Sequence, residues 1–310
     1  MATGGAVSVP RRRRLSRSVL SENLAGFLFI SPWIVGFLAF ELGPILAAGY
    51  LSVTSYDLLS EASFVGLRNY ERMFTRDPLF WTSLRLTTIY SVAAVALHVV
   101  FGVALALLLN NNIRGIAFYR AIYYLPAVVS GVAVAYMWVW VLNPEAGIVN
   151  TLLRYLGIQG PNWLFNAELA LPTFVALSVW GVGGGMVLYL AGLQGVPTAL
   201  YEAAQLDGAG WLARTRHVTL PMISPVIFFN VIVGIINSFQ VFTVAFIMTN
   251  GGPANATLFY VLNLYRKAFE EFKMGYAAAL AMVLFVIVMA LTVVAFRVSR
   301  RLVHYEGQAR

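Results

Sequence analysis

A polar segment, residues 195–221, interrupts the apolar second half of the chain and carries two acidic groups, Glu202 and Asp207. Its residues of interest are Glu202-Ala203-Ala204, Asp207-Gly208, Trp211, Leu212 and the closing Leu220-Pro221. The glycine and the proline predict a helix, a break and a second helix stopped by proline. The two alanines make the first helix slim enough to enter a groove of another protein, where the carboxylates can accept hydrogen bonds. The pattern indicates a docking surface.

A second group of polar side chains lies within an apolar stretch, 222–249, that should cross a membrane. At about 100° per residue, Asn230, Gly234 and Asn237 share one helix face, with Gln240 off to one side. Amides surrounded by lipid must face protein or a water-filled path. Two interpretations therefore remain: hydrogen bonds between helices, or the lining of a pathway that meets a hydroxyl-rich solute.

The sequence does not assemble groups for hydrolysing ATP or for binding a metal. A phosphate-binding P-loop needs a Gly-Lys pair, whereas the lysines here follow Arg266 and Phe272. We therefore expect no cofactor in this chain, with ATP and Mg²⁺ bound by a separate subunit. The chain has no cysteine, and its three histidines are scattered. His98, inside an apolar stretch, is more simply a helix-contact residue than a proton relay.

These groups are carried by a chain whose composition is that of a membrane protein. It is 60% hydrophobic and 11% charged, with a mean hydropathy of +0.77, whereas a soluble domain carries about 25% charge. Backbone groups in lipid must be satisfied within their own segment, which predicts helices. The expected fold is an all-α membrane protein with about six transmembrane helices, at 24–47, 86–109, 121–142, 171–194, 222–249 and 275–298. Close helix packing explains the glycine run 181–185.

The distribution of charge predicts the topology. Most lysines and arginines fall in cytoplasmic segments if the N-terminus is cytoplasmic, which also places the C-terminus inside. The expected parts are a cytoplasmic basic tail at 1–20, a transmembrane domain at 21–300 and a cytoplasmic tail at 301–310. The run Arg11–Arg14 precedes a span directly, so it indicates topology and not a nucleic-acid site. The external segments should contain short helices, over 69–74 and 258–272 among them.

The polar segment resembles the EAA loop of bacterial ABC importer permeases. The match joins Glu202-Ala203-Ala204, Asp207-Gly208-Ala209 and Val218–Pro221, in this order and ahead of the penultimate predicted helix. Other pieces are similar to the maltose-type and glycerol-phosphate-type permeases of the carbohydrate branch, namely Phe64–Tyr70, Ala191–Gln194, Thr249–Pro253 and Ala268-Phe269. The resemblance covers about residues 24–300.

This resemblance implies a type I ABC importer transmembrane domain, which is a non-catalytic permease subunit of the bacterial inner (plasma) membrane for a sugar or polyol. Its partners would be a second homologous permease, a dimer of ATP-binding ABC subunits and an external solute-binding protein. The coupling helix that docks on the ATPase would present Glu202, Ala203, Ala204, Asp207 and Gly208. Glu202 should open this helix, where a carboxylate complements the positive helix end. The family commonly has a phenylalanine where this chain has Arg214–Arg216, and Trp211 or Leu212 could replace it.

Other classes of protein fit the sequence less well. A secondary transporter driven by an ion gradient typically needs midplane charges or an inverted repeat, and the predicted helices offer His98 and the peripheral Glu41. A membrane-embedded enzyme needs clustered acids, bases or metal ligands. An ABC importer permease for a non-carbohydrate solute is the alternative that the sequence leaves open.

Overall fold

The chain folds into helices that form two compact units, Met1–Tyr50 and Leu51–Arg310. The computed structural model describes residues 17–111 and 113–302. The run Arg11–Arg14 and most of the expected tails 1–20 and 301–310 lie outside the described residues. Within the described residues, three single helices and three bent helix pairs are long and apolar enough to cross a membrane. The expected all-α membrane fold is confirmed.

The first unit is a long helical run that contains a π-helical turn. It consists of α1 (Arg17–Phe37), the π turn η1 (Leu38–Leu42) and the beginning of α2 (Gly43–Ser52). Pro44 has no N–H to donate, so the helix takes a wider turn, in which the Gly43 N–H bonds to the Leu38 carbonyl. The apolar helix runs from Leu24 to Ser52, past the predicted end at residue 47.

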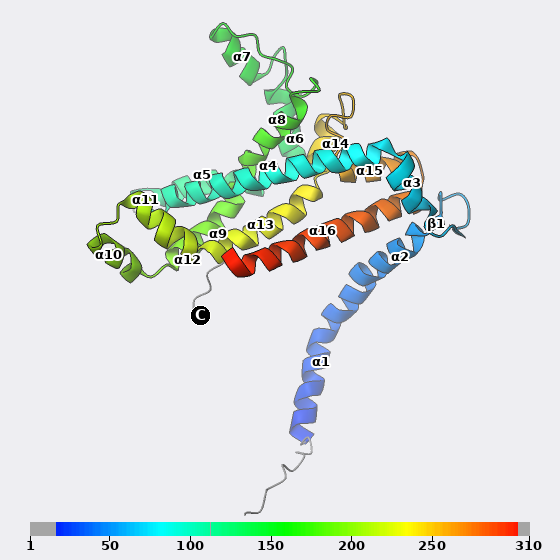
Figure 1. The fold of residues 1–310 in the computed structure, drawn as a ribbon, viewed down its shortest axis with the longest axis horizontal. Coiled ribbons are helices and arrows are strands. Elements are labelled where there is room, and N and C mark those ends of the chain that lie inside the picture. Colours follow the sequence, from blue (N-terminus) through cyan, green and yellow to red (C-terminus); the bar gives the residue numbers. More distant parts are fainter. Residues whose placement is uncertain (1–16, 112, 303–310) are drawn as a thin grey trace, which may run out of the picture. The chain divides into compact units, whose positions relative to one another are not determined.

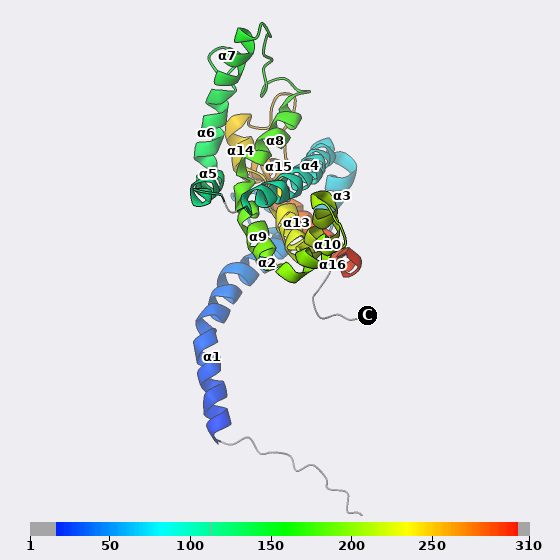
Figure 2. The same cartoon turned by 90° about the vertical axis from the view of Figure 1, so that its left-hand side faces the viewer.

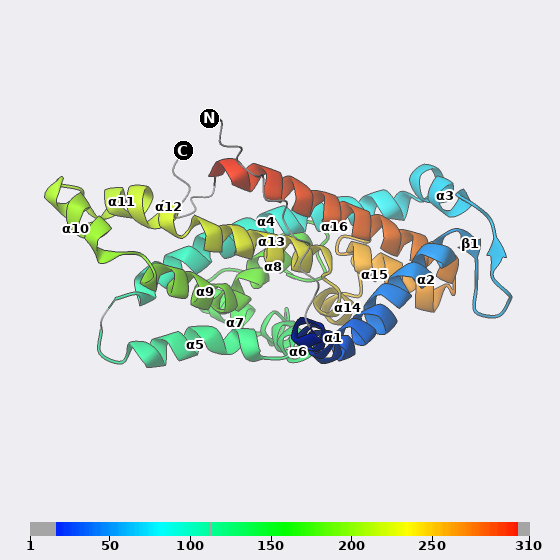
Figure 3. The same cartoon turned by 90° about the horizontal axis from the view of Figure 1, so that it is seen from below.

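Long helices around α4 form the centre of the second unit. They are α4 (Pro78–Leu109), α13 (Ser224–Phe239) and α16 (Met274–Leu302), and Figures 1 and 3 show them side by side. α4 starts well ahead of the predicted residue 86, because Asp77 caps it by accepting a hydrogen bond from the Leu79 N–H at 2.9 Å. Proline at the first helical position favours the same start, since its missing N–H is not needed there.

Buried hydroxyl groups on α4 fix two neighbouring helices. Thr87 Oγ1 accepts a hydrogen bond from the Tyr260 N–H at 2.8 Å, at the start of α15 (Tyr260–Tyr265). Ser91 shares a 2.5 Å hydrogen bond with Ser238 of α13. The two α4 residues are four apart and lie on one face of the helix. Hydroxyl bonds of this kind join helices in a membrane, so the N-terminal half of α4 is held on both α13 and α15.

Three candidate spans are bent helix pairs, and two of them lie where straight spans were expected, at 121–142 and 171–194. The three pairs are α5 (Ile116–Val128) with α6 (Gly131–Val141) at 97°, α8 (Ala170–Ser178) and the 3₁₀ turn η2 (Val179–Gly181) with α9 (Gly183–Gln194) at 46°, and the helical run 211–222 with α13 at 66°. In the first pair, Val129 and Ser130 adopt ψ values of 137° and 135°, which end one helix and start the next. The prediction of one helix over 121–142 is therefore wrong. Figure 2 shows α6 and α7 (Ile148–Tyr155) leading away from α5.

The helix predicted over 222–249 is interrupted as well. α13 ends at Phe239 with Gln240 as its C-cap, and the chain becomes helical again in α14 (Thr243–Met248). Phe242, between the two helices, has a φ of −139°. The polar residues Asn237, Ser238 and Gln240 lie at this break, but the average hydropathy of the whole stretch is that of one continuous span.

The segments between spans contain a small hairpin and short helices. They are the antiparallel strands β1 (Thr54–Ser55) and β2 (Ser63–Phe64), α3 (Arg68–Arg76), and the π turn η4 (Arg266–Glu270) that follows α15. The helix expected over 69–74 is confirmed by α3. The one expected over 258–272 is shorter, because residues 257–259 enter it in an irregular conformation and it ends before Glu271.

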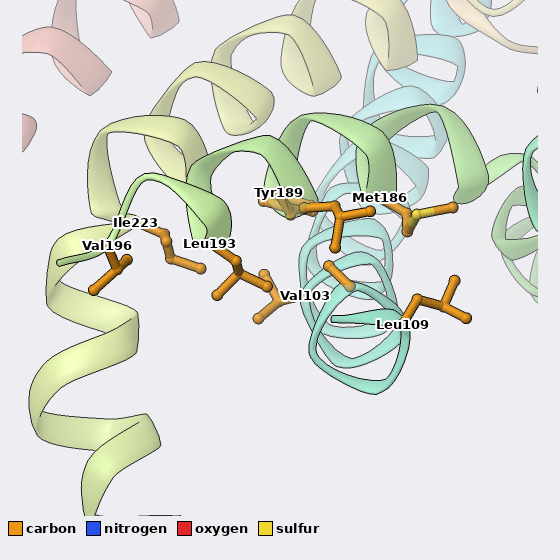
Figure 4. Close-up of a cluster of buried hydrophobic side chains, with 9 residues drawn as sticks. Val103, Leu109, Met186, Tyr189, Leu193, Val196 and Ile223 are labelled. Carbon is orange, nitrogen blue, oxygen red and sulfur yellow. The ribbon is translucent and has the colours of Figure 1, made fainter. Parts of the chain in front are cut away.

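A buried apolar cluster joins α4, α9 and the two ends of the polar segment (Figure 4). It contains Val103, Ala106, Leu109, Met186, Tyr189, Leu190, Leu193, Val196 and Ile223. Val196 lies at the beginning of segment 195–221, and Ile223 lies just beyond its end. Burying an aliphatic side chain of this size contributes about 1.5–3 kcal/mol. Both ends of the polar segment are thus fixed to the same core.

Candidate functional site

The polar segment 195–221 forms two helices that meet at Gly208. α10 (Thr198–Leu206) is followed by one helical run made of α11 (Trp211–Arg214), the π turn η3 (Thr215–Thr219) and α12 (Leu220–Met222). We call this pair the docking hairpin. Figures 1 and 3 place it at one end of the second unit, with α3 and β1 at the opposite end. The expected helix, glycine break and second helix are confirmed.

The second helix does not stop at proline as predicted. The Leu220 N–H bonds to the Thr215 carbonyl across the π turn, and the helix continues through Pro221 to Met222. The wider turn before the proline accommodates the N–H that proline lacks. The helical run therefore leads into α13 through a bend of 66°.

Gly208 ends α10 in a left-handed conformation, with a φ of +77°. The Ala209 N–H bonds to the Ala204 carbonyl at 2.9 Å, and the Gly208 N–H bonds to the Gln205 carbonyl at 3.0 Å. This pair of bonds is the Schellman arrangement, which favours glycine because a Cβ destabilises the left-handed backbone. An added Cβ would meet no atom within 4 Å. The requirement for glycine in this chain thus comes from the backbone angle and not from lack of space.

The acidic and small residues expected to dock lie on the surface of the hairpin. Glu202, Ala203, Asp207 and Gly208 are exposed, and Ala204 is half-buried. α10 begins at residue 198 and has no acidic residue in its first turn. The prediction that Glu202 opens the helix is therefore wrong, and its carboxylate lies on the helix flank, where a partner could reach it.

Exposed apolar side chains surround these carboxylates. Leu206 is 90% exposed, Trp211 66% and Leu212 71%, whereas Arg214 and Thr215 are half-buried. Sequence reasoning singled out Trp211 and Leu212 but not Leu206. The signal that could have found it is a leucine in the last turn of a helix that otherwise presents polar residues. Grouped, exposed apolar side chains are typical of a surface that another protein covers.

Tyr201 fixes the docking hairpin to the apolar core. Its hydroxyl lies 3.1 Å from Thr219 Oγ1, so a hydrogen bond joins α10 to the second helix of the hairpin. Its ring packs against the core cluster that contains Val196 and Ile223. Movement of the hairpin would therefore be passed to α9 and α4 through packed side chains.

A cavity of about 420 Å³ lies between α4, α9 and α13. Its polar lining comes from Tyr90, His98, Ser178, Tyr189, Asn230, Asn237 and Ser238. Gly181, Gly184, Gly185 and Gly234 also line it, so backbone is presented on its walls. Tyr189 borders the cavity and belongs to the core that holds the docking hairpin. One packed residue thus connects the two candidate sites.

The amides predicted to share one helix face lie together at this cavity, with one exception. Asn230, Gly234 and Asn237 line it, whereas Gln240 is the exposed C-cap of α13 and does not. Asn230 Nδ2 donates to the Val226 carbonyl of its own helix at 2.9 Å. Because this bond stays within α13, the nitrogen does not serve as a bridge to another helix.

Two features that sequence reasoning treated as packing also belong to the cavity. His98 is a helix contact, as expected, since its Nε2 lies 2.6 Å from the Ser178 carbonyl oxygen. It lines the cavity as well. The glycine run 181–185 packs closely on α5, but three of its members face the cavity. The signals in the sequence that could have indicated this cavity were a histidine and several glycines within apolar helices.

The lining of the cavity combines apolar side chains with polar groups that carry no formal charge from acidic or strongly basic residues. Among the described residues that line it, none is Asp, Glu, Lys or Arg. Amides, hydroxyls and an imidazole can both donate and accept hydrogen bonds. An anion buried there would lose several kcal/mol of hydration without a compensating charge. The cavity therefore suits an uncharged solute rich in hydroxyl groups.

Comparison with known proteins agrees with this arrangement. Residues 98–304 match the family described as binding-protein-dependent transport system inner membrane component. The chain is 44% identical over 297 residues to the probable ABC transporter permease protein YesP of Bacillus subtilis, covering 94% of this chain and 96% of that protein. It is 34% identical over 284 residues to the trehalose/maltose transport system permease protein MalF of Thermococcus litoralis, covering 90% and 95%.

The fold also matches a solved structure. A chain of a bacterial alginate ABC transporter, crystallised with a periplasmic protein bound to an alginate pentasaccharide, superposes with a TM-score of 0.82 at 22% identity. The match covers 93% of this chain and 98% of that chain. The helical fold described above is thus that of an ABC importer transmembrane domain. The chain belongs to the family of binding-protein-dependent transport system inner membrane components.

Proposed function

We propose that this chain forms the translocation pathway of an ATP-driven importer for a sugar or polyol. The observation that carries the proposal is the uncharged cavity between α4, α9 and α13, whose largely apolar walls carry amide, hydroxyl and imidazole groups. The relative in Thermococcus litoralis is named as a trehalose/maltose permease, which supports a carbohydrate solute. The family consists of permease subunits, so the chain is not itself an enzyme.

The docking hairpin supports a role in coupling. In this proposal it contacts a dimer of ATP-binding subunits, which hold ATP and Mg²⁺, through Glu202, Asp207 and the exposed apolar residues around them. Movement of the hairpin then reaches the cavity through Tyr201 and the core that includes Tyr189. A second homologous permease would complete the pathway across the bilayer, and an external solute-binding protein would deliver the solute.

The experiment that tests this function is solute uptake by the complete complex in proteoliposomes. With the permease, ATPase and binding protein encoded alongside this chain, we expect accumulation of a sugar or polyol that requires ATP. Accumulation of amino acids or metal ions, and of no sugar or polyol, would contradict the carbohydrate assignment. Uptake driven by an ion gradient without ATP would contradict the coupling assignment.

Gly181→Leu should block the same uptake, because the new side chain would occupy the cavity. Gly181 lines the cavity, and an added Cβ would meet no atom within 4 Å, so the substitution is compatible with the fold. An increase of about 1.4 kcal/mol in the transport barrier lowers the rate about tenfold, and we expect at least that loss. Gly131→Leu is the matched control, since Gly131 also has open space but does not line the cavity. Wild-type uptake by Gly181→Leu would place the pathway elsewhere.

Both termini should be cytoplasmic, because lysine and arginine are concentrated on that side in the proposed topology. A reporter that is active in the cytoplasm should work when fused at Gly307. A reporter that needs the exterior should work when inserted at Glu168, in the exposed segment between α7 and α8. An external signal at Gly307 would overturn the topology.

A further inference from the structure

The break between α8 and α9 forms part of the cavity wall, and a side chain of α4 contacts it. α8 ends at Ser178, the 3₁₀ turn η2 follows, and α9 begins at Gly183 after a bend of 46°. Ser178 and Gly181 line the cavity together with His98 of α4. His98 is part-buried, with Nε2 at 2.6 Å from the Ser178 carbonyl oxygen. The contact therefore joins two walls of the same cavity.

This contact adds a side-chain hydrogen bond at the point where the backbone bonding changes from α-helical to 3₁₀. In an unbroken α-helix the Ser178 carbonyl would accept from the Val182 N–H. Here the Val182 N–H bonds to the Val179 carbonyl at 3.2 Å instead. A carbonyl oxygen can only accept, so His98 Nε2 carries the proton and donates it. Broken membrane helices persist where side chains satisfy the backbone groups that they release.

We propose that His98 is a positioning residue for transport, which holds the α8–α9 break, and with it the glycine wall of the cavity, in the bent geometry. Without the His98 donor, the bent geometry loses this bond between α4 and the Ser178 carbonyl, so the regular α-helical bond from the Val182 N–H becomes favoured and the helix straightens. Straightening moves Gly181, Gly184 and Gly185 relative to α13 and changes the shape of the cavity. This inference depends on the proposed function in one point, namely that the solute passes through this cavity.

The first test compares two substitutions in the complete complex. His98→Phe keeps a ring of similar size but has no donor, whereas His98→Gln places an amide N–H near the position of Nε2. We expect His98→Phe to lower the maximal uptake rate about tenfold, equivalent to about 1.4 kcal/mol in the barrier, with little change in the half-saturating solute concentration. His98→Gln should restore the rate to near wild type.

The second test measures the bend directly and does not depend on the solute. The chain has no cysteine, so nitroxide labels at Glu168→Cys and Gln194→Cys report one distance, and both positions are exposed. The two helices, Ala170–Gly181 and Gly183–Gln194, are each about 18 Å long and are bent by 46° from a straight line. Straightening them would lengthen the end-to-end distance by about 3 Å. We expect electron–electron double resonance to show this lengthening in His98→Phe and not in His98→Gln.

The outcomes separate this inference from the proposed function. An unchanged label distance and uptake rate in His98→Phe would overturn the inference, and so would a His98→Gln variant that behaves like His98→Phe in both measurements. If His98→Phe does not assemble, His98→Gln is compared with His98→Asn, whose amide is one methylene shorter and should show the lengthening. A label distance that changes as expected in a complex that imports no sugar or polyol would support the inference and contradict the proposed solute.

Discussion

Gly208→Val should abolish solute uptake and solute-stimulated ATP hydrolysis while the protein still inserts into the membrane. Gly208 has a φ of +77° and closes α10 through the Schellman pair of hydrogen bonds. A residue with a Cβ costs about 1–2 kcal/mol in this conformation, and β-branched valine fits it worst. The turn would open and move Trp211 and Leu212 away from Glu202. The two halves of the docking surface would then no longer meet the ATPase together.

Matched variants show whether the backbone angle is the cause. Gly208→Asn should retain much more activity, because asparagine tolerates the left-handed conformation and the site has open space around it. Glu202→Ala should also have a smaller effect, since Asp207 and the apolar residues remain. Each variant is expressed with its partner subunits, and membrane insertion, co-purified ATPase and stimulated hydrolysis are measured. Normal stimulation with Gly208→Val would show that the hairpin is not the coupling element.

Gly183→Ala should prevent assembly of a stable helix bundle. An added Cβ would lie 1.8 Å from the Tyr123 carbonyl oxygen and 2.7 Å from its carbon, which are backbone atoms of α5. Because a backbone cannot rotate away as a side chain can, α5 and α9 would have to separate. Overpacking usually costs about 1–3 kcal/mol and occasionally more. We expect the upper end of this range, seen as a large drop in the folded fraction after detergent extraction.

The adjacent glycine provides the control. A Cβ at Gly184 would meet the Ala127 side chain at 3.5 Å, an ordinary contact. Gly184→Ala should therefore keep a wild-type melting temperature in the same detergent, as read by size-exclusion chromatography after heating. Equal stability of the two variants would mean that α5 and α9 are not packed backbone to backbone.

The sequence by itself determined the fold class and the nature of the docking hairpin. Hydropathy requires helices, because unpaired backbone groups are not tolerated in lipid, and the expected all-α membrane fold is confirmed. The helix, glycine break and second helix of the hairpin follow from local chemistry, since a left-handed helix end favours glycine wherever the rest of the chain lies. Asn230, Gly234 and Asn237 could be placed on one face for a similar reason, because helical periodicity is local.

Only the tertiary structure decided where spans bend and what the polar groups face. The breaks at Val129-Ser130 and after Phe239 lie within stretches whose overall hydropathy is that of a continuous span, so the average does not reveal them. In the sequence nothing distinguishes Gly183 from the adjacent Gly184. Gly183 has no room for a side chain only because the backbone of α5 packs against it. The sequence gives no partner for His98, and the structure shows that its partner is a backbone carbonyl at a bend in another helix. Hydropathy and periodicity describe a segment by itself, whereas bends, cavities and these contacts depend on segments that are distant in the chain and meet only when it is folded.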